Sequence, residues 1–152
     1  MKDTYEINKS TLAVVPIDEN TSRVLEETTE YIVNKPSFEI IEDSCMYFGS
    51  TYQGRYDGTK NLLGMSYKLP IIIEESRNII FFPTSSTRTK QSTWIALNKI
   101  KDISKKNHNS EIEFKNKEKL DLDISVNSLE NQIVRATMLK SKLFERKLEE
   151  KN

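Results

Sequence analysis

The sequence predicts an α+β fold, a mostly antiparallel sheet with a central helical segment and a C-terminal helix. Short runs of β-branched and aromatic residues alternate with polar turns through much of the chain. After Pro36 the apolar residues recur at spacings of three and four, which indicates a helix, and a longer amphipathic stretch follows Asn127. The length of 152 residues fits a single domain, residues 1–152, with a substantial core.

The first strands form a small antiparallel meander. Its apolar runs are residues 12–16, 23–26 and 30–34, and short polar segments separate them. The remaining short strands are predicted over residues 70–73, 111–114 and 120–124.

The central helix follows Pro36. Its apolar residues Phe38, Ile41, Cys45 and Phe48 share one face, with Ser37 placed to cap the first turn and Gly49 to end the helix. We expect Cys45 to be a packed thiol on the buried face, because the chain has one cysteine and one histidine to assemble any reactive site.

Residues 49–60 contain several glycines, and a cation, Arg55, directly follows Gly54. The Gly-x-x-x-x-Gly spacing resembles a nucleotide phosphate loop, but Arg55 and Tyr56 stand where such a loop needs Lys and then Ser or Thr. Two readings remain for this segment: it approaches a nucleic-acid backbone through Arg55 and Lys60, or it connects two helices.

The most informative stretch is a long hairpin. Residues 78–83 and 94–97 are apolar arms around a ten-residue tip that carries Arg88, Lys90 and many hydroxyls but no acid. Hydroxyls and cations without carboxylates suit contact with phosphate oxygens. The alternative is a solvated hairpin tip without a ligand.

The last element is a helix. Asn127 and Glu130 have capping-box spacing, and an apolar side follows to the end of the chain. Much of the remaining surface is cationic, which indicates either a solvated face or a helix that contacts a nucleic-acid backbone. These cations are Arg135, Lys140, Lys142, Arg146 and Lys147.

Charge is distributed unevenly although the net charge is zero. Residues 1–43 hold four cations against ten acids, and residues 44–101 hold eight cations against three acids. The asymmetry favours a polyanionic or acidic partner for the middle of the chain, or an acidic N-terminal part that folds back over it.

Several classes of protein are not indicated. The apolar runs are far shorter than the roughly 18 residues of a membrane span, and no secretory signal begins the chain, so we expect a cytoplasmic protein. His108 lies in a polar turn without a partner for catalysis, and no metal-ligand cluster or cofactor loop is evident. We therefore expect neither an enzyme nor a cofactor.

Taken together, four segments resemble the ComK family of competence transcription factors. They cover most of the chain, from about Tyr5 to Phe144, and their order and spacing carry the resemblance. The segments are Cys45-Met46-Tyr47-Phe48-Gly49-Ser50-x-Tyr52-x-Gly54-Arg55, Phe82-Pro83-Thr84-Ser85-Ser86-Thr87-Arg88, Trp94-Ile95 and Asn127-Ser128-Leu129-Glu130-Asn131-Gln132.

The resemblance implies a sequence-specific, DNA-binding transcriptional activator, a competence regulator associated with the nucleoid. It implies recognition of paired AT-rich boxes through the minor groove, by dimers that pair into a tetramer. The DNA-binding residues expected on this basis are Arg88, Lys90, Gln91, Ser85, Ser86, Thr87, Arg55, Lys60, Arg135 and Lys142. The alternative is a protein-interaction module that uses the basic central surface.

The resemblance also bears on regulation. Family members can carry a further C-terminal tail through which an adaptor delivers them to a protease. This sequence stops at Asn152, shortly after the last predicted helix, so it is either a short homologue or a trimmed chain. The resemblance therefore does not extend to adaptor control through that tail.

Overall fold

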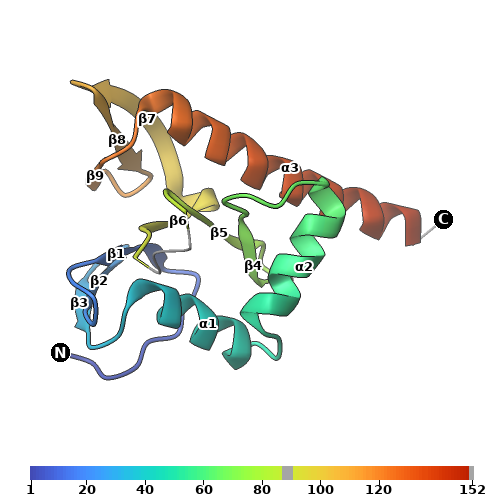
Figure 1. The fold of residues 1–152 in the computed structure, drawn as a ribbon, viewed down its shortest axis with the longest axis horizontal. Helices are drawn as coiled ribbons and strands as arrows, with labels where there is room; N and C mark the ends of the chain where they lie inside the picture. The colour runs from blue at the N-terminus through green and yellow to red at the C-terminus, as the bar shows by residue number, and fades with distance from the viewer. Residues whose placement is uncertain (87–90, 151–152) are drawn as a thin grey trace.

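A computed structural model describes residues 1–86 and 91–150 and confirms the α+β class. Within these ranges, two antiparallel sheets and three helices make up the fold (Figure 1). Along the chain these are β1 (Thr11–Pro16), β2 (Ser22–Glu26), β3 (Glu30–Val33), α1 (Ser37–Tyr47), α2 (Tyr52–Leu63), β4 (Ile71–Glu74), β5 (Ile79–Pro83), β6 (Trp94–Ala96), a 3-10 turn (Leu97–Lys99), β7 (Ile100–Lys106), β8 (Asn109–Phe114), β9 (Lys119–Leu122) and α3 (Val126–Glu150).

The hairpin predicted around residues 78–97 lies in the middle of the larger sheet. The strand order is β3-β2-β1-β6-β5-β4, with every neighbouring pair antiparallel. β6 pairs with β5 through Pro83 and Trp94, and it also pairs with β1 through Val14 and Trp94. The N-terminal meander thereby joins the hairpin to form one continuous sheet.

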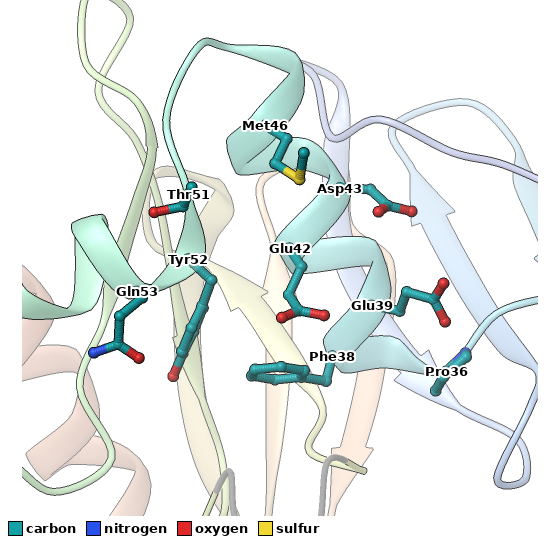
Figure 2. Close-up of a pocket in the computed structure, with 9 residues that line it drawn as sticks. All are labelled: Pro36, Phe38, Glu39, Glu42, Asp43, Met46, Thr51, Tyr52 and Gln53. Atoms are coloured by element: carbon teal, nitrogen blue, oxygen red, sulfur yellow. The ribbon is translucent and has the colours of Figure 1, made fainter.

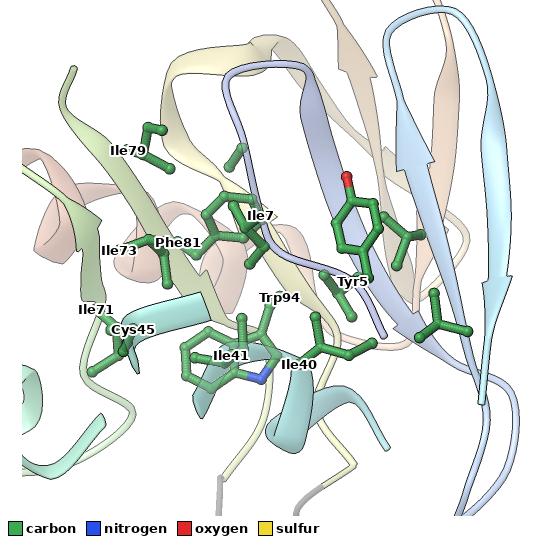
Figure 3. Packing of buried hydrophobic residues seen from close by; sticks show 14 residues of the cluster. Tyr5, Ile7, Ile40, Ile41, Cys45, Ile71, Ile73, Ile79, Phe81 and Trp94 are labelled. Atoms are coloured by element: carbon green, nitrogen blue, oxygen red, sulfur yellow. The ribbon is translucent and has the colours of Figure 1, made fainter. Parts of the chain in front are cut away.

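The larger sheet is buried on both faces. Successive side chains of a strand point to opposite faces. On β5, Phe81 therefore joins the cluster beneath α1, whereas Ile80 and Phe82 join the cluster beneath the smaller sheet and α3. Figure 3 shows Trp94 and Cys45 packed in the first cluster. Burial on both faces explains why residues 79–82 are apolar without alternation.

The central helix begins at Ser37, as predicted, but Ser37 does not cap it. Pro36 occupies the N-cap position in an extended conformation, without a side-chain cap. Ser37 is buried, and its Oγ donates to the carbonyl oxygen of Ser92 at 2.7 Å. The hydroxyl therefore binds the hairpin instead of the first turn of its own helix.

The glycine-punctuated segment is largely a helix, α2, which the sequence did not reveal. Thr51 caps it by accepting a hydrogen bond from the Gly54 amide at 2.9 Å, and Gly64 ends it in the left-handed conformation. Each glycine inside a helix costs about 1 kcal/mol relative to alanine. Packing of Tyr52 and Tyr56 against the core supports the helix nonetheless.

Two further boundaries differ from the prediction. The second hairpin arm, predicted over residues 94–97, ends at Ala96, because the 3-10 turn redirects the chain into the smaller sheet. The helix start moves two residues upstream from the proposed capping box. The cap is Ser125, whose Oγ accepts a hydrogen bond from the Ser128 amide at 3.1 Å.

Candidate nucleic-acid interface

The base of the hairpin tip is a neck, residues 84–85 and 92–93, whose two strands are joined by hydrogen bonds. The Thr84 amide donates to the Thr93 carbonyl at 2.9 Å, which extends the β5–β6 ladder beyond Pro83. One step further, the Ser85 and Ser92 hydroxyls lie 2.8 Å apart, and the Ser92 Oγ also contacts the Ser85 carbonyl at 2.9 Å. These contacts hold the two strands together next to Ser86 and Gln91, where the described chain stops and resumes.

Helix α1 holds one side of this neck. Ser92 is buried, and its carbonyl accepts the hydrogen bond from Ser37 at the start of α1. Its hydroxyl faces Ser85 across the neck. Ser92 therefore links the hairpin to helix α1. Neither its residue type nor its position in the sequence predicted that role.

Helix α3 holds the other side. Gln132 is 1% exposed, and its Nε2 donates to the Pro83 carbonyl at 2.6 Å and to the Lys68 carbonyl at 2.9 Å. Its Oε1 accepts a hydrogen bond from Arg135 Nη1 at 2.7 Å. A buried amide with its donors and acceptor engaged is strongly held in one geometry. Gln132 therefore fixes the end of β5 to α3.

Residues of the tip itself lie partly outside the described chain. Thr87, Arg88 and Lys90 belong to residues 87–90, which the structure does not describe. Gln91 is exposed beside them. The two serines that we expected at the DNA, Ser85 and Ser86, are half-buried in the neck, where Ser85 uses its hydroxyl within the protein.

The two candidates on α2 have different environments. Lys60 is exposed and lies in the last turn of the helix. Arg55 is half-buried, and its Nε is buried without a hydrogen-bond partner among the described residues. Lys60 is thus well placed for a phosphate, whereas the half-buried Arg55 is less accessible to one.

The two candidates on α3 share one flank of that helix. Arg135 donates to the Tyr67 carbonyl at 3.3 Å as well as to Gln132, which orients its guanidinium near the surface. Lys142 is exposed and lies 3.8 Å from Glu145. At 100° per residue, Arg135, Lys142 and Arg146 fall within roughly 40° of one another around the helix. Arg146, which we had not singled out for DNA contact, is exposed on this same ridge.

An acidic pocket of about 660 Å³ lies between α1 and the start of α2 (Figure 2). Its walls carry the carboxylates of Glu39, Glu42 and Asp43 and the apolar side chains of Phe38 and Met46. Lys35 neutralises part of this charge, because its Nζ lies 2.7 Å from Asp43 and 3.8 Å from Glu39. The pocket chemistry disfavours phosphate, so we place the candidate interface on the neck, α2 and α3 instead.

Other kinds of site are not evident in the described part of the chain. Residues 1–86 and 91–150 contain no group of three or more His, Cys, Asp or Glu side chains that could hold a metal ion. Within these same ranges no helix has the length and apolar character needed to cross a membrane. His108 is exposed at the β7–β8 turn, as predicted.

Comparison with known proteins gives a consistent result. A family model described as ComK protein matches residues 2–148. A competence transcription factor of Bacillus subtilis (strain 168) is 36% identical over 148 residues, which cover 95% of this chain and 77% of that relative. No solved structure matches the chain.

Proposed function

The chain belongs to the ComK family, and on that premise we propose that it is a transcriptional activator that binds duplex DNA at AT-rich sites. The hairpin tip enters the minor groove, and cations on α2 and α3 contact the flanking phosphates. The protein acts in the cytoplasm at the nucleoid, as a dimer that pairs into a tetramer on DNA.

The observation that supports this proposal most directly is the clamped neck. Ser37 from α1 and Gln132 from α3 hold its two sides, so the tip leaves a rigid base at the centre of a buried sheet. A preorganised base reduces the conformational entropy that a reading loop loses on binding. The tip sequence Thr87-Arg88-Thr89-Lys90 supplies cations and hydroxyls without an acid.

The chemistry of the tip suits a narrow AT-rich minor groove. Such a groove concentrates negative potential that attracts Arg and Lys. Its floor presents the acceptors adenine N3 and thymine O2, whereas a G·C pair adds the guanine amino group as a donor. Arg88, Lys90 and Gln91 can donate to those acceptors, and the guanine amino group would obstruct them.

Contacts to the backbone would position the tip. Lys60, Arg135 and Lys142 are the described candidates for phosphates, and Arg55 is a half-buried fourth. Phosphate contacts add affinity that is independent of sequence and falls as salt rises.

One binding experiment separates the two grooves. The protein is titrated with three duplexes: an AT-rich site, its GC-rich counterpart, and a version in which inosine·cytosine pairs replace the A·T pairs. Inosine·cytosine lacks the guanine amino group, so its minor groove resembles that of A·T while its major groove resembles that of G·C. We expect the AT-rich and inosine duplexes to bind alike and the GC-rich duplex to bind at least tenfold more weakly. Equal affinity for all three would reject sequence-specific reading.

A further inference from the structure

The acidic pocket between α1 and α2 has no part in the proposed contact with DNA, because its carboxylates repel phosphate. Its volume of about 660 Å³ lies within the range of clefts that bind ligands in proteins. Such clefts combine apolar walls with a few polar or charged groups that select the ligand. The acidic pocket has both kinds of group.

Aromatic and apolar side chains form part of its walls. Phe38 belongs to the first turn of α1 and Tyr52 to the first turn of α2. Figure 2 shows their rings next to each other at one end of the pocket, and the ring centroids lie 4.7 Å apart in an edge-to-face arrangement. Met46 lines the pocket further along α1 and is 65% exposed. An apolar side chain of a ligand therefore has a concave surface on which to pack.

The carboxylates of α1 make the pocket selective for cations. Lys35 forms ion pairs with Asp43 and Glu39, so one lysine faces the three carboxylates of Glu39, Glu42 and Asp43. An excess of negative charge remains. The side chains of Glu39 and Asp43 are 47% and 35% exposed, which leaves them accessible to a binding partner. Complementary charge favours the encounter with a cationic partner over other partners.

We propose that the acidic pocket binds a segment of another protein that carries a bulky apolar side chain between Lys or Arg residues. The apolar side chain packs against Phe38, Met46 and Tyr52. The flanking cations pair with Glu39 and Glu42. An apolar centre within a charged rim is the usual arrangement of a protein–protein interface. A polyamine would match the charge of the pocket, but it has no bulky side chain to cover the apolar walls.

The position of the pocket brings such a partner close to the base of the hairpin. Pro36 and Phe38 line the pocket, and Ser37 between them donates its hydrogen bond to Ser92 in the neck. A protein held in the pocket would therefore lie beside the DNA contact. This consequence rests on the proposed function, whereas the pocket and its ligand class do not.

Fluorescence anisotropy with a defined peptide tests the ligand class. The probe is a short fluorescein-labelled peptide with one phenylalanine between two pairs of lysines. One comparison peptide has serine in place of the phenylalanine, and another has glutamates in place of the lysines. We expect the probe to bind the wild-type protein at least tenfold more tightly than either comparison peptide at about 0.1 M salt. Equal affinity for the three peptides, or the absence of saturable binding, would overturn the proposal.

Two matched double variants test whether the probe binds in the pocket. Glu39→Gln with Glu42→Gln removes two charges from the pocket, whereas Glu118→Gln with Glu130→Gln removes two exposed charges elsewhere. We expect the pocket variant to bind the probe at least tenfold more weakly and with a smaller dependence on salt. The control should bind it like the wild type. Equal losses in the two variants would show that net charge attracts the peptide, and would overturn the pocket as its site.

Met46→Ser tests the apolar wall separately. The side chain is exposed, so circular dichroism should report an unchanged fold. We expect the variant to bind the probe at least threefold more weakly with an unchanged salt dependence, and an unchanged affinity would count against the apolar contact.

Competition experiments distinguish the other possible occupants of the pocket. Displacement of the probe by an equal concentration of spermidine would assign the pocket to polyamines. Probe affinity that falls as the protein concentration rises would assign it to a second copy of the chain. Either result would overturn the proposal, and we expect neither. Because none of these measurements uses DNA, their outcome is independent of the preference for AT-rich sites.

Discussion

Gln132 donates a hydrogen bond of 2.6 Å to the carbonyl oxygen of Pro83, which joins the inner face of α3 to the last residue of β5. The two residues are 49 positions apart in the chain. Through this contact the helix that carries Arg135 and Lys142 is fixed relative to the strand that leads into the hairpin tip. The buried amide of Gln132 therefore helps to set the spacing between the two groups of candidate DNA contacts, together with the apolar packing of α3 on β5.

Replacing Gln132 with leucine tests this coupling. Leucine has a similar size but leaves the carbonyls of Pro83 and Lys68 without their donor, so we expect the free energy of unfolding to fall by about 1 to 3 kcal/mol. DNA affinity should fall further than this loss explains at temperatures where the variant is fully folded. Urea unfolding and duplex titration measure the two effects. Gln53→Leu, at an exposed position on α2, is the control and should change stability by less than about 0.5 kcal/mol. Unchanged DNA affinity in folded Gln132→Leu would contradict the coupling.

Ser92→Ala should affect discrimination more than stability. The variant loses the contacts between Ser92 and Ser85 but keeps the Ser92 carbonyl that accepts from Ser37, so we expect about 1 kcal/mol of destabilisation. A looser neck should lower the ratio of AT-rich to GC-rich affinity. Duplex titration measures the ratio, with Ser104→Ala as the control. A lower stability with an unchanged ratio would show that the neck serves the fold alone.

Arg88→Ala and Lys60→Ala should weaken DNA binding in different ways. Loss of a groove-reading arginine should cost about 1 to 3 kcal/mol on the AT-rich duplex and much less on the GC-rich one. Loss of a phosphate contact at Lys60 should weaken both duplexes alike and reduce the salt slope by about one. Titrations across a salt series measure both quantities. The assignment of roles fails if Arg88→Ala weakens the two duplexes equally.

Cys45 should be unreactive in the native protein. Burial raises the pKa of its thiol from 9.0 to about 11, with the nearby Arg55 opposing that shift. The thiolate is the reactive form, so a thiol reagent at pH 8 should modify Cys45 only when the chain opens. Because the folded pKa is the higher one, this group favours the folded state fully below pH 9. That contribution is lost as pH rises from about 9 to about 11. The exposed thiol of Ser104→Cys is the control, and rapid modification of native Cys45 would contradict the packing in Figure 3.

The sequence predicted those features that depend on local pattern. The meander, the arms at Ile79–Pro83 and Trp94–Ala96, and the C-terminal helix follow from apolar runs and spacing that nearby residues determine. Cys45 was correctly placed on the buried face of α1, because the 3.6-residue period identifies that face. Helix α2 was missed because Gly54 and Gly58 obscure its pattern, and packing of its tyrosines overrides their low helix propensity.

The parts of the site that the sequence did not predict depend on contacts between distant residues. Ser37 resembled a helix cap, yet its partner is Ser92, 55 residues away. The sequence does contain a signal for Gln132, because it is a polar residue among the apolar positions of α3 and buried polar groups need hydrogen-bond partners. The identity of those partners, however, follows only from the arrangement of α3 over β5.

The pairing of β6 with β1 has a consequence for how the chain is made. Ala13 pairs with Ile95, so this pairing can form only after some eighty further residues have been synthesised. Until then one side of β1 offers unpaired amides and carbonyls to any extended peptide nearby. A nascent chain that stops before Trp94 should therefore be prone to aggregation. The need for chaperones during translation should be greatest while this edge of β1 is unpaired.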